Sequence, residues 1–244
     1  MKKKLVTGAL LCAFGAVAVT GGTLAYFTDK DQAENVFTTG NVDIALEEVF
    51  DADNAKLIPG IDIQKEVDVR NAGSEEAYVR IHLAVPSMLD SGSEDQPQFA
   101  AYNNTLHWNF SKAAVADGLW NWHNENVNGA SLPGWPGNGG AWNMYQQTID
   151  GVLYNVYVAT YETALPGATI SDVASATTAE PAIHKVYLDK AVTNEMMAEI
   201  TKQLGPNPKV LVVAEGGQVA GFNNAYDALN TQFGVPGTYN PWAK

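Results

Sequence analysis

WNMYQQTIDGVLYNVYVATY, residues 142–161, decides the fold class of this chain. Two runs rich in aromatic and β-branched residues, 142–149 and 152–161, flank the dipeptide Asp150-Gly151. Asp-Gly supplies the two positive φ angles that a type I′ turn requires, and this turn joins antiparallel strands. The segment therefore predicts a β-hairpin. The apolar residues of its second strand do not alternate strictly, so this strand can be buried on both faces.

Alternation of apolar and polar residues predicts more strands before the hairpin. Three segments show this pattern: 42–47, 61–69 and 79–85. The turn sequence Asn-Ala-Gly-Ser at 71–74 predicts that the last two are antiparallel strands with a short connection. Arg80 and His82 share the polar face of 79–85. We expect His82 to be a surface or sheet-face residue and Arg80 to pair with a neighbouring carboxylate.

Further strands and two short helices are predicted after the hairpin. The strands cover 183–188 and 209–214, and the second is apolar enough for a central position in a sheet. Each helix has a capping residue and a terminating glycine. These are Thr193 or Asn194 with Gly205 for the first helix, and Asn223 or Asn224 with Gly234 for the second. The pattern predicts a mostly β chain, an antiparallel jelly-roll-like β-sandwich with short helices, formed by residues 41–244.

Residues 87–140 interrupt the regular periodicity, and we interpret them as a long insertion. Asn, Gly and Pro accumulate there together with four tryptophans: Trp108, Trp120, Trp122 and Trp135. Long loops are usually functional or disordered, and aromatic residues argue against disorder because they have large apolar surfaces to bury. Two roles stay open for these tryptophans. They can pack the loop onto its own domain, or they can stack on the sugar rings of a carbohydrate.

The first 25 residues have the organisation of a secretory signal peptide. Three lysines at 2–4 precede an apolar run at 5–19, and Ala25 provides a small-residue cleavage site before Tyr26. A membrane anchor is the alternative, but four glycines weaken the helix and the apolar core is shorter than the ~20 residues of a membrane span. We expect cleavage, secretion, and an N-terminal leader of residues 26–40.

Charge and motif content exclude several functions. With 27 acidic and 14 basic residues the chain has a net charge of −13, which disfavours nucleic acid as a partner. The only cysteine is Cys12, inside the signal peptide. The histidines are scattered, and no zinc-peptidase, serine-hydrolase, phosphate-loop or dinucleotide motif is present. We expect no catalytic residue, no metal site and no cofactor.

The junction GTLAYFTDKDQAENVFTTGNVDI, residues 22–44, closely resembles the TasA, CalY and camelysin family. Its recognisable parts are Ala25 at the cleavage site, YFTD at 26–29, Asn35, Phe37, and Gly40 before the first strand. The likeness is clear over residues 2–85. Residues 87–140 depart from the best-known members, and the later segments are similar in pattern to distant members from anaerobic Gram-positive bacteria.

The resemblance implies a secreted jelly-roll subunit of biofilm-matrix or cell-surface fibres, exported through a SipW-type signal peptidase. In that family an N-terminal strand freed by cleavage completes the sheet of the next subunit. Here the donor would be residues 26–37, with Tyr26, Phe27, Val36 and Phe37 as its apolar anchors. The implied partners are further copies of the chain, the signal peptidase, and an adaptor protein or a cell-wall or matrix polysaccharide.

Two other functions remain as alternatives. The tryptophans of residues 87–140 would suit a carbohydrate- or surface-binding module. Camelysins have also been described as metalloendopeptidases, although the sequence offers no ligand set for that activity. We expect a structural protein without enzymatic activity.

Overall fold

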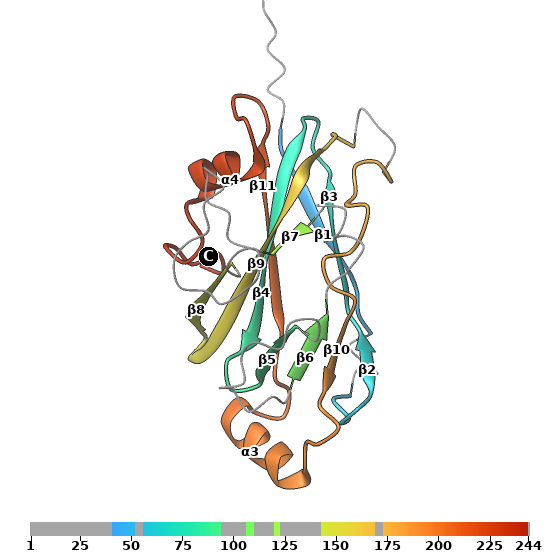
Figure 1. Cartoon of the computed structure of the whole chain (residues 1–244). Helices are drawn as coiled ribbons and strands as arrows, with labels where there is room; N and C mark the ends of the chain where they lie inside the picture. Colours follow the sequence, from blue (N-terminus) through green and yellow to red (C-terminus); the bar gives the residue numbers. More distant parts are fainter. Residues whose placement is uncertain are drawn as a thin grey trace, which may run out of the picture. The chain divides into compact units, whose positions relative to one another are not determined.

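The computed structural model describes residues 41–51, 56–93, 106–109, 120–122, 143–168 and 173–243. All of them belong to the unit Gly40–Lys244. Within this unit most elements are strands, the pairing is mainly antiparallel, and two helices are present among the described residues (Figure 1). The predicted mostly β class is therefore confirmed, whereas the jelly-roll order of strands stays a prediction. The predicted signal peptide and leader lie outside the described residues.

The first sheet is built around the predicted hairpin, which is confirmed. Its strands are β4 (Ala77–Pro86), β7 (Trp120–Asn121), β8 (Met144–Ile149), β9 (Val152–Leu165) and β11 (Leu211–Gln218). The turn between β8 and β9 contains Asp150 with φ 49° and Gly151 with φ 82°. The other edge of β9 pairs with β4, which in turn pairs with β11. β8 and β7 both pair with β9 on the edge opposite β4, β8 with its first half and β7 further along.

The other strands form one four-stranded sheet and one two-stranded sheet, which together make the second layer of the sandwich and which we call the second sheet. They are β1 (Ile44–Val49), β2 (Asp62–Gln64), β3 (Glu66–Asn71), β5 (Asp90–Ser93), β6 (Leu106–Asn109) and β10 (Lys185–Leu188). β10 pairs with β2 and β6, β6 pairs in parallel with β5, and β1 pairs with β3. Backbone hydrogen bonds between 65–71 and 176–184 extend the β2–β10 pairing alongside β3. β1 is therefore the outermost strand at one side of this sheet.

The predicted strand 61–69 is divided at Lys65 into β2 and β3, which have neighbours on opposite edges. The prediction that this strand and 79–85 form an antiparallel pair is wrong, because β3 and β4 lie in different sheets. Residues 71–74 carry the chain from one sheet to the other. The Asn71 side chain holds this crossing, since its Nδ2 donates to the carbonyl oxygens of Glu75 and Leu165 at 2.7 and 3.1 Å.

The described parts of residues 87–140 belong to the sandwich, so the interpretation of the whole stretch as an insertion is corrected. β5 and β6 lie in the second sheet and β7 in the first. These strands have two to four residues, too few for an alternation pattern to be recognised. The predicted central position of 209–214 is also wrong, because β11 is the terminal strand of its sheet. It is apolar because Val212 packs on the inner core and Leu211 on an outer cluster.

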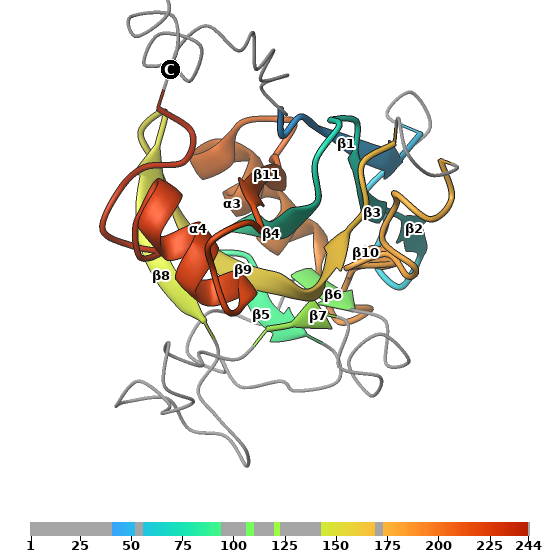
Figure 2. The ribbon, with the colours of Figure 1, turned by 90° about the horizontal axis from the view of Figure 1, so that it is seen from above.

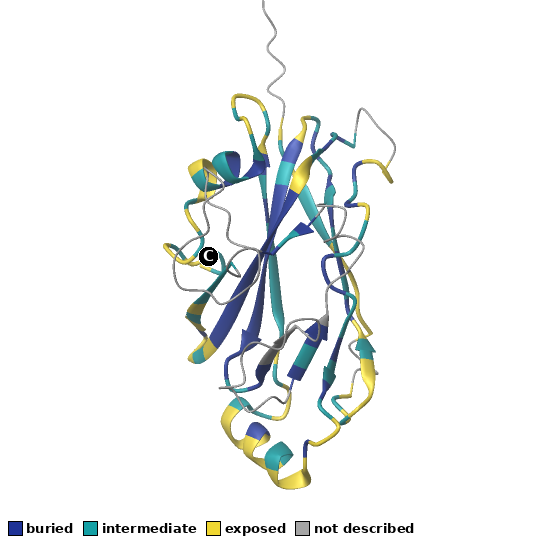
Figure 3. Ribbon diagram, viewed as in Figure 1, coloured by how far each residue is buried: buried dark blue, intermediate teal, exposed yellow. Residues whose placement is uncertain are grey.

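The main core lies between the two sheets, where buried positions of β4 and β9 are concentrated (Figure 3). Val79, Ile81 and Leu83 of β4 share this core with Val67 and Val69 of β3. A smaller apolar cluster covers the outer face of the first sheet. It contains Ala84, Ile149, Tyr154 and Val156, with Trp242 packed against it.

Both predicted helices are confirmed. In α3 (Asn194–Leu204) the hydroxyl of Thr193 accepts a hydrogen bond from the backbone N–H of Met196. In α4 (Ala225–Phe233) the side chain of Asn224 caps the first turn in the same way. Figure 2 shows α4 outside the first sheet, on the side away from β1, β2 and β3. This position allows α4 to cover the polar face of β4.

Gly151 should be required by the hairpin turn. Replacing it with Ala places a Cβ in the left-handed region and should lower the free energy of unfolding by about 1–2 kcal/mol. The control is Asp150→Asn, which should be nearly neutral because Asn tolerates positive φ. Urea unfolding at pH 7 measures both values. Equal stability of Gly151→Ala and the unchanged chain would contradict the turn assignment.

Candidate functional site

A cluster of charged and polar side chains is buried on the outer face of the first sheet. Arg80 and His82 occupy alternate positions of β4, and Glu215 of β11 lies opposite Arg80. Their exposed fractions are 2%, 0% and 7%. Of the two expected positions for His82, surface or sheet face, the structure shows the sheet face, and the C-terminal residues bury it. With Tyr145 and Tyr239 these three residues form what we call the Arg80 cluster.

The guanidinium of Arg80 joins β4 to three other segments. Its Nε donates to Glu215 Oε2 at 2.5 Å, and its Nη1 donates to Asn230 Oδ1 at 2.9 Å. Its Nη2 donates to the carbonyl of Gly234 at 3.0 Å and to the hydroxyl of Tyr239 at 2.6 Å. The C-terminal end of a helix carries partial negative charge, so a cation is favourable at the end of α4. The prediction that Arg80 pairs with a carboxylate is confirmed.

His82 lies between Glu215 and Tyr145. Its Nε2 is 3.2 Å from Glu215 Oε2, and its Nδ1 is 3.1 Å from the Tyr145 hydroxyl. A neutral imidazole that donates from Nε2 and accepts at Nδ1 satisfies both contacts, and we assign this tautomer. The Tyr239 hydroxyl donates to the same carboxylate, 2.7 Å from Oε1 and 2.8 Å from Oε2. The rings of Tyr145, Tyr239 and Trp242 approach the imidazole edge-on.

The contacts of the cluster set its protonation states. Burial alone would raise the pKa of Glu215, but the His82 hydrogen bond and the Arg80 charge outweigh it and lower this pKa to about 2. Burial lowers the pKa of His82 below its ordinary value, although the hydrogen bond and charge of Glu215 oppose this shift. Burial also raises the pKa of the Tyr145 and Tyr239 hydroxyls. At neutral pH the carboxylate is therefore ionised, the imidazole neutral and both phenols protonated.

The Arg80 cluster does not fit a zinc centre. A protein zinc site uses three or four ligands, whereas this cluster offers His82 and Glu215 and places a guanidinium on the carboxylate. No group of three His, Cys, Asp or Glu side chains suited to a metal occurs in the described ranges. The arrangement instead connects β4 and β11 to α4 and the C-terminal segment.

The other described histidines make separate contacts. His107 Nε2 is 3.0 Å from Asp189 Oδ2, and its ring stacks on Tyr187 with 4.9 Å between centroids. The pKa of Asp189 is lowered by the backbone N–H of Ala191 and by His107. His184 Nδ1 lies 3.9 Å from Glu66. The described histidines are thus dispersed in space as they are in the sequence, and His123 lies outside the described residues.

Three of the four candidate ligand-contact tryptophans are in the core. Trp108, Trp120 and Trp122 have exposed fractions of 0%, 1% and 1%. Trp108 packs against Trp122 and Tyr157, and Trp120 donates from Nε1 to the carbonyl of Glu180 at 2.8 Å. Loop packing explains these positions. The carbohydrate-contact hypothesis is corrected for these three residues, because stacking needs an exposed ring face, and Trp135 lies outside the described residues.

The outer edge of β1 has backbone groups available for pairing. The carbonyl of Asp43 accepts hydrogen bonds from Ala72 and Gly73, on the side of β3. In antiparallel pairing alternate residues point to opposite edges, so the backbone groups of residues 45, 47 and 49 also face β3. Those of residues 44, 46 and 48 therefore face outward. No strand in the described ranges pairs with this edge.

The outer edge of β11 is also available. The backbone N–H of Gln218 is bound by the side chain of Gln232, at 3.2 Å, and so points away from β4. By the same alternation the backbone groups of residues 212, 214 and 216 face outward. As for β1, no described strand pairs there.

The two free edges lie side by side. At one end Gly216 allows close approach, because a Cβ there would lie 2.4 Å from Cγ2 of Ile44. At the other end Phe50 and Leu211 line a cavity of about 560 Å³. The edges of β1 and β11 thus meet at Ile44 and Gly216, and Phe50, directly after β1, and Leu211, at the start of β11, line the cavity at the other end. We call this region the β1–β11 seam.

The predicted cleavage and donor residues lie outside the described residues: Ala25, Tyr26, Phe27, Val36 and Phe37. The helices of the described ranges are too short or too polar to cross a membrane. Sequence reasoning did not identify Glu215 or Tyr239 as partners of Arg80, and it did not identify the seam. The one available signal was Glu215, a carboxylate that directly follows the apolar run 209–214 in the sequence.

Removing one charge of the Arg80–Glu215 pair should strongly destabilise the chain. Glu215→Gln leaves a buried unpaired guanidinium and should lower the free energy of unfolding by about 3–5 kcal/mol. Adding Arg80→Met should cost less than the sum of the two single changes, because no unpaired charge then remains. Urea unfolding gives all three values.

The matched control for the ion pair is Arg70→Met. Arg70 Nε lies 2.6 Å from Glu47 Oε1, but these side chains are 27% and 47% exposed. Loss of this pair should cost only about 0–1 kcal/mol. Equal costs for the exposed and buried pairs, or strictly additive effects of Arg80→Met and Glu215→Gln, would contradict the assigned role.

Stability should fall on acidification because of His82 and Glu215. The folded pKa of His82 lies below its ordinary value of 6.5, so the unfolded chain binds a proton more readily and stability decreases as pH falls below 6.5. Glu215 adds a further loss between pH 4.5 and about 2. His82→Gln should remove the loss that begins below pH 6.5, and Glu215, which keeps its contacts with Arg80 and Tyr239, should still give a smaller loss at lower pH. Urea unfolding across this pH range tests it, and parallel curves for variant and unchanged chain would refute the role of His82.

One family model is similar to the N-terminal part of this chain. Residues 1–84 match the family model described as camelysin metallo-endopeptidase. A search of curated proteins found no match. The matched residues include the junction 22–44 and continue through β1, β2 and β3 into β4. The match confirms, over residues 1–84, the similarity of this chain to the TasA, CalY and camelysin family.

Proposed function

We propose that this chain is an extracellular structural subunit of matrix or cell-surface fibres, joined to further copies by strand addition. The observation that carries the proposal is the β1–β11 seam. An added strand would find backbone donors and acceptors at residues 44, 46 and 48 of β1, or at 212, 214 and 216 of β11. Backbone hydrogen bonds supply affinity in such contacts, and alternate side chains supply register.

The donor in this proposal is the leader segment 26–37 of a neighbouring copy. Tyr26, Phe27, Val36 and Phe37 are its apolar side chains, and the family match extends over both this segment and β1. A contact between a leader and a seam joins two different surfaces, so it does not close on itself and generates a filament. Cleavage removes three lysines and none of the 27 acidic residues, so the subunit is more acidic than the full chain with its net charge of −13, and this charge would limit lateral association of filaments.

Secretion and processing follow from the same proposal. A SipW-type signal peptidase would cut between Ala25 and Tyr26 and so free the donor segment. An adaptor protein or a polysaccharide of the cell wall or matrix would anchor the fibre. No thiol remains after cleavage, so the core between the two sheets supplies the stability that many exported proteins obtain from disulfides.

Peptidase activity is the second candidate, because the matching family is described as a metallo-endopeptidase. Its weakness is that the described residues lack a suitable ligand set. Hydrolysis of casein by the purified chain with added Zn²⁺, abolished by a chelator, would support this function.

Removal of the donor segment should abolish assembly. The chain from Tyr26 should form filaments visible by negative-stain electron microscopy, and the chain lacking residues 26–37 should remain monomeric with an unchanged circular dichroism spectrum. Filaments from both chains would refute donation by this segment.

Proline at the free edges should identify the acceptor strand. Glu48→Pro removes an outward N–H from β1 without removing a bond to β3, and Ala214→Pro does the same for β11. The matched controls are Glu48→Gln and Ala214→Ser, which keep the backbone donor. One proline variant should lose filaments while its control forms them. Normal filaments from both proline variants would contradict strand addition at the seam.

A further inference from the structure

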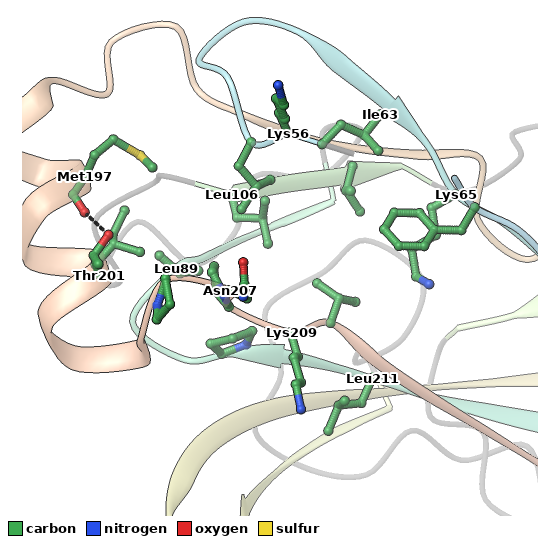
Figure 4. A pocket seen from close by; sticks show the side chains of 18 residues that line it. Lys56, Ile63, Lys65, Leu89, Leu106, Met197, Thr201, Asn207, Lys209 and Leu211 are labelled. Atoms are coloured by element: carbon green, nitrogen blue, oxygen red, sulfur yellow. Dashed lines mark hydrogen bonds between the residues drawn. The ribbon is translucent and has the colours of Figure 1, made fainter. Parts of the chain in front are cut away.

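The cavity at the open end of the β1–β11 seam has the size and lining of a small-molecule site. Its volume of about 560 Å³ lies within the usual range of such sites. It is bounded by β2, β6 and β10 of the second sheet, by α3 and by the segment that leads into β11 (Figure 4). Most lining side chains are apolar, among them Leu57, Ile63, Leu89, Leu106, Val186 and Ile200.

The charged side chains that line this cavity are all of one sign. Three of its described lining residues are lysines, Lys56, Lys65 and Lys209, and none is acidic. This is unusual in a chain with 27 acidic and 14 basic residues. Lys65 is buried and pairs with Glu48 at 3.0 Å. Lys56 and Lys209 are exposed, and no acidic side chain of the described ranges pairs with them.

An exposed apolar surface adjoins the cavity. A second hollow, of about 610 Å³, shares Phe50, Lys56 and Ile63 with it. Around this hollow Val49, Phe50, Ile58 and Ile61 are 40–54% exposed. Contiguous exposed apolar side chains often mark the place where an apolar ligand or partner binds. Because Glu48, Asp51 and Asp62 also border the outer hollow, an anionic group would be favoured at the rim of the inner cavity instead.

We propose that this cavity binds a long-chain fatty acid. The acyl chain lies among the apolar residues between the sheets and α3, and the carboxylate lies at the rim, where the exposed side chain of Lys56 or Lys209 borders the cavity. Burial of the chain supplies affinity, and an ammonium–carboxylate contact selects an anionic head group. A neutral lipid would leave the lysines without a counter-charge, and a sugar or nucleotide would leave the apolar walls unmatched. The site is independent of the proposed fibre function.

Binding can be measured with cis-parinaric acid, a fatty acid whose fluorescence rises in apolar surroundings. The chain from Tyr26 is used, because the apolar signal segment would itself bind the probe, together with the chain lacking residues 26–37. Both chains are kept dilute, so that monomers are tested. Saturable binding with one probe per chain is expected for both. Palmitate should displace the probe, whereas methyl palmitate and hexadecyltrimethylammonium should displace it at least about tenfold less effectively.

Two variants locate the site. Lys56→Glu with Lys209→Glu should weaken probe binding about tenfold or more, because an attractive charge becomes repulsive. The matched control is Lys190→Glu with Lys202→Glu, which changes net charge equally at exposed lysines outside the cavity lining and should bind normally. Met197→Trp places an indole in the cavity and should block the probe. Urea unfolding confirms that each variant is folded.

Several results would overturn the proposal. They are no saturable binding, equal displacement by the neutral ester, and equal affinity of the two double-lysine variants. Displacement of the probe by a peptide of residues 26–37, with no displacement by palmitate, would show that the cavity receives the leader segment instead. Loss of filaments with normal probe binding, or the reverse, would separate this site from the proposed fibre function.

Discussion

The buried ion pair between Arg80 and Glu215 is the interaction on which the C-terminal half of this unit depends. Taking a guanidinium out of water costs several kcal/mol unless its donors are satisfied. Glu215 satisfies one donor, and the end of α4 and Tyr239 satisfy the others. The charge on β4 therefore requires the C-terminal residues to fold over the outer face of the first sheet. Once they do so, Trp242 can cover the second apolar cluster.

In contrast to this covered face, the β1–β11 seam leaves strand edges available for pairing. Unpaired strand edges invite association with other chains, and proteins usually protect them. Here β1 carries Glu47 and Glu48 near its end, and the side chain of Gln232 occupies the end of β11. The middle of each edge is left available. Strand addition and a ligand cavity thus involve the same side of the sandwich through different groups, the backbone in one case and side chains in the other.

Local elements of the fold could be predicted because their causes are local. Asp150-Gly151 requires a particular turn, and Thr193 and Asn224 cap helices that end at glycines. Pairing between distant strands could not be predicted in this way. The alternation in 61–69 is the same whichever strand lies alongside, and β5, β6 and β7 are too short to show any period. The candidate site was predictable only in part. A charged residue on an apolar strand needs a partner, but the residues next to Arg80 in the sequence do not show that this partner is Glu215.

The sequence by itself determined the mostly β class, the central hairpin, both helices, the acidic charge and the family resemblance carried by residues 22–44. These depend on backbone preferences, composition and motif, which are properties of contiguous residues. Only the tertiary structure decided that Arg80 and His82 are buried, that three tryptophans belong to the core, and that β1 and β11 leave neighbouring edges free. Burial and edge pairing depend on which distant segment covers a residue, and alternation of side chains along one strand carries no information about that segment.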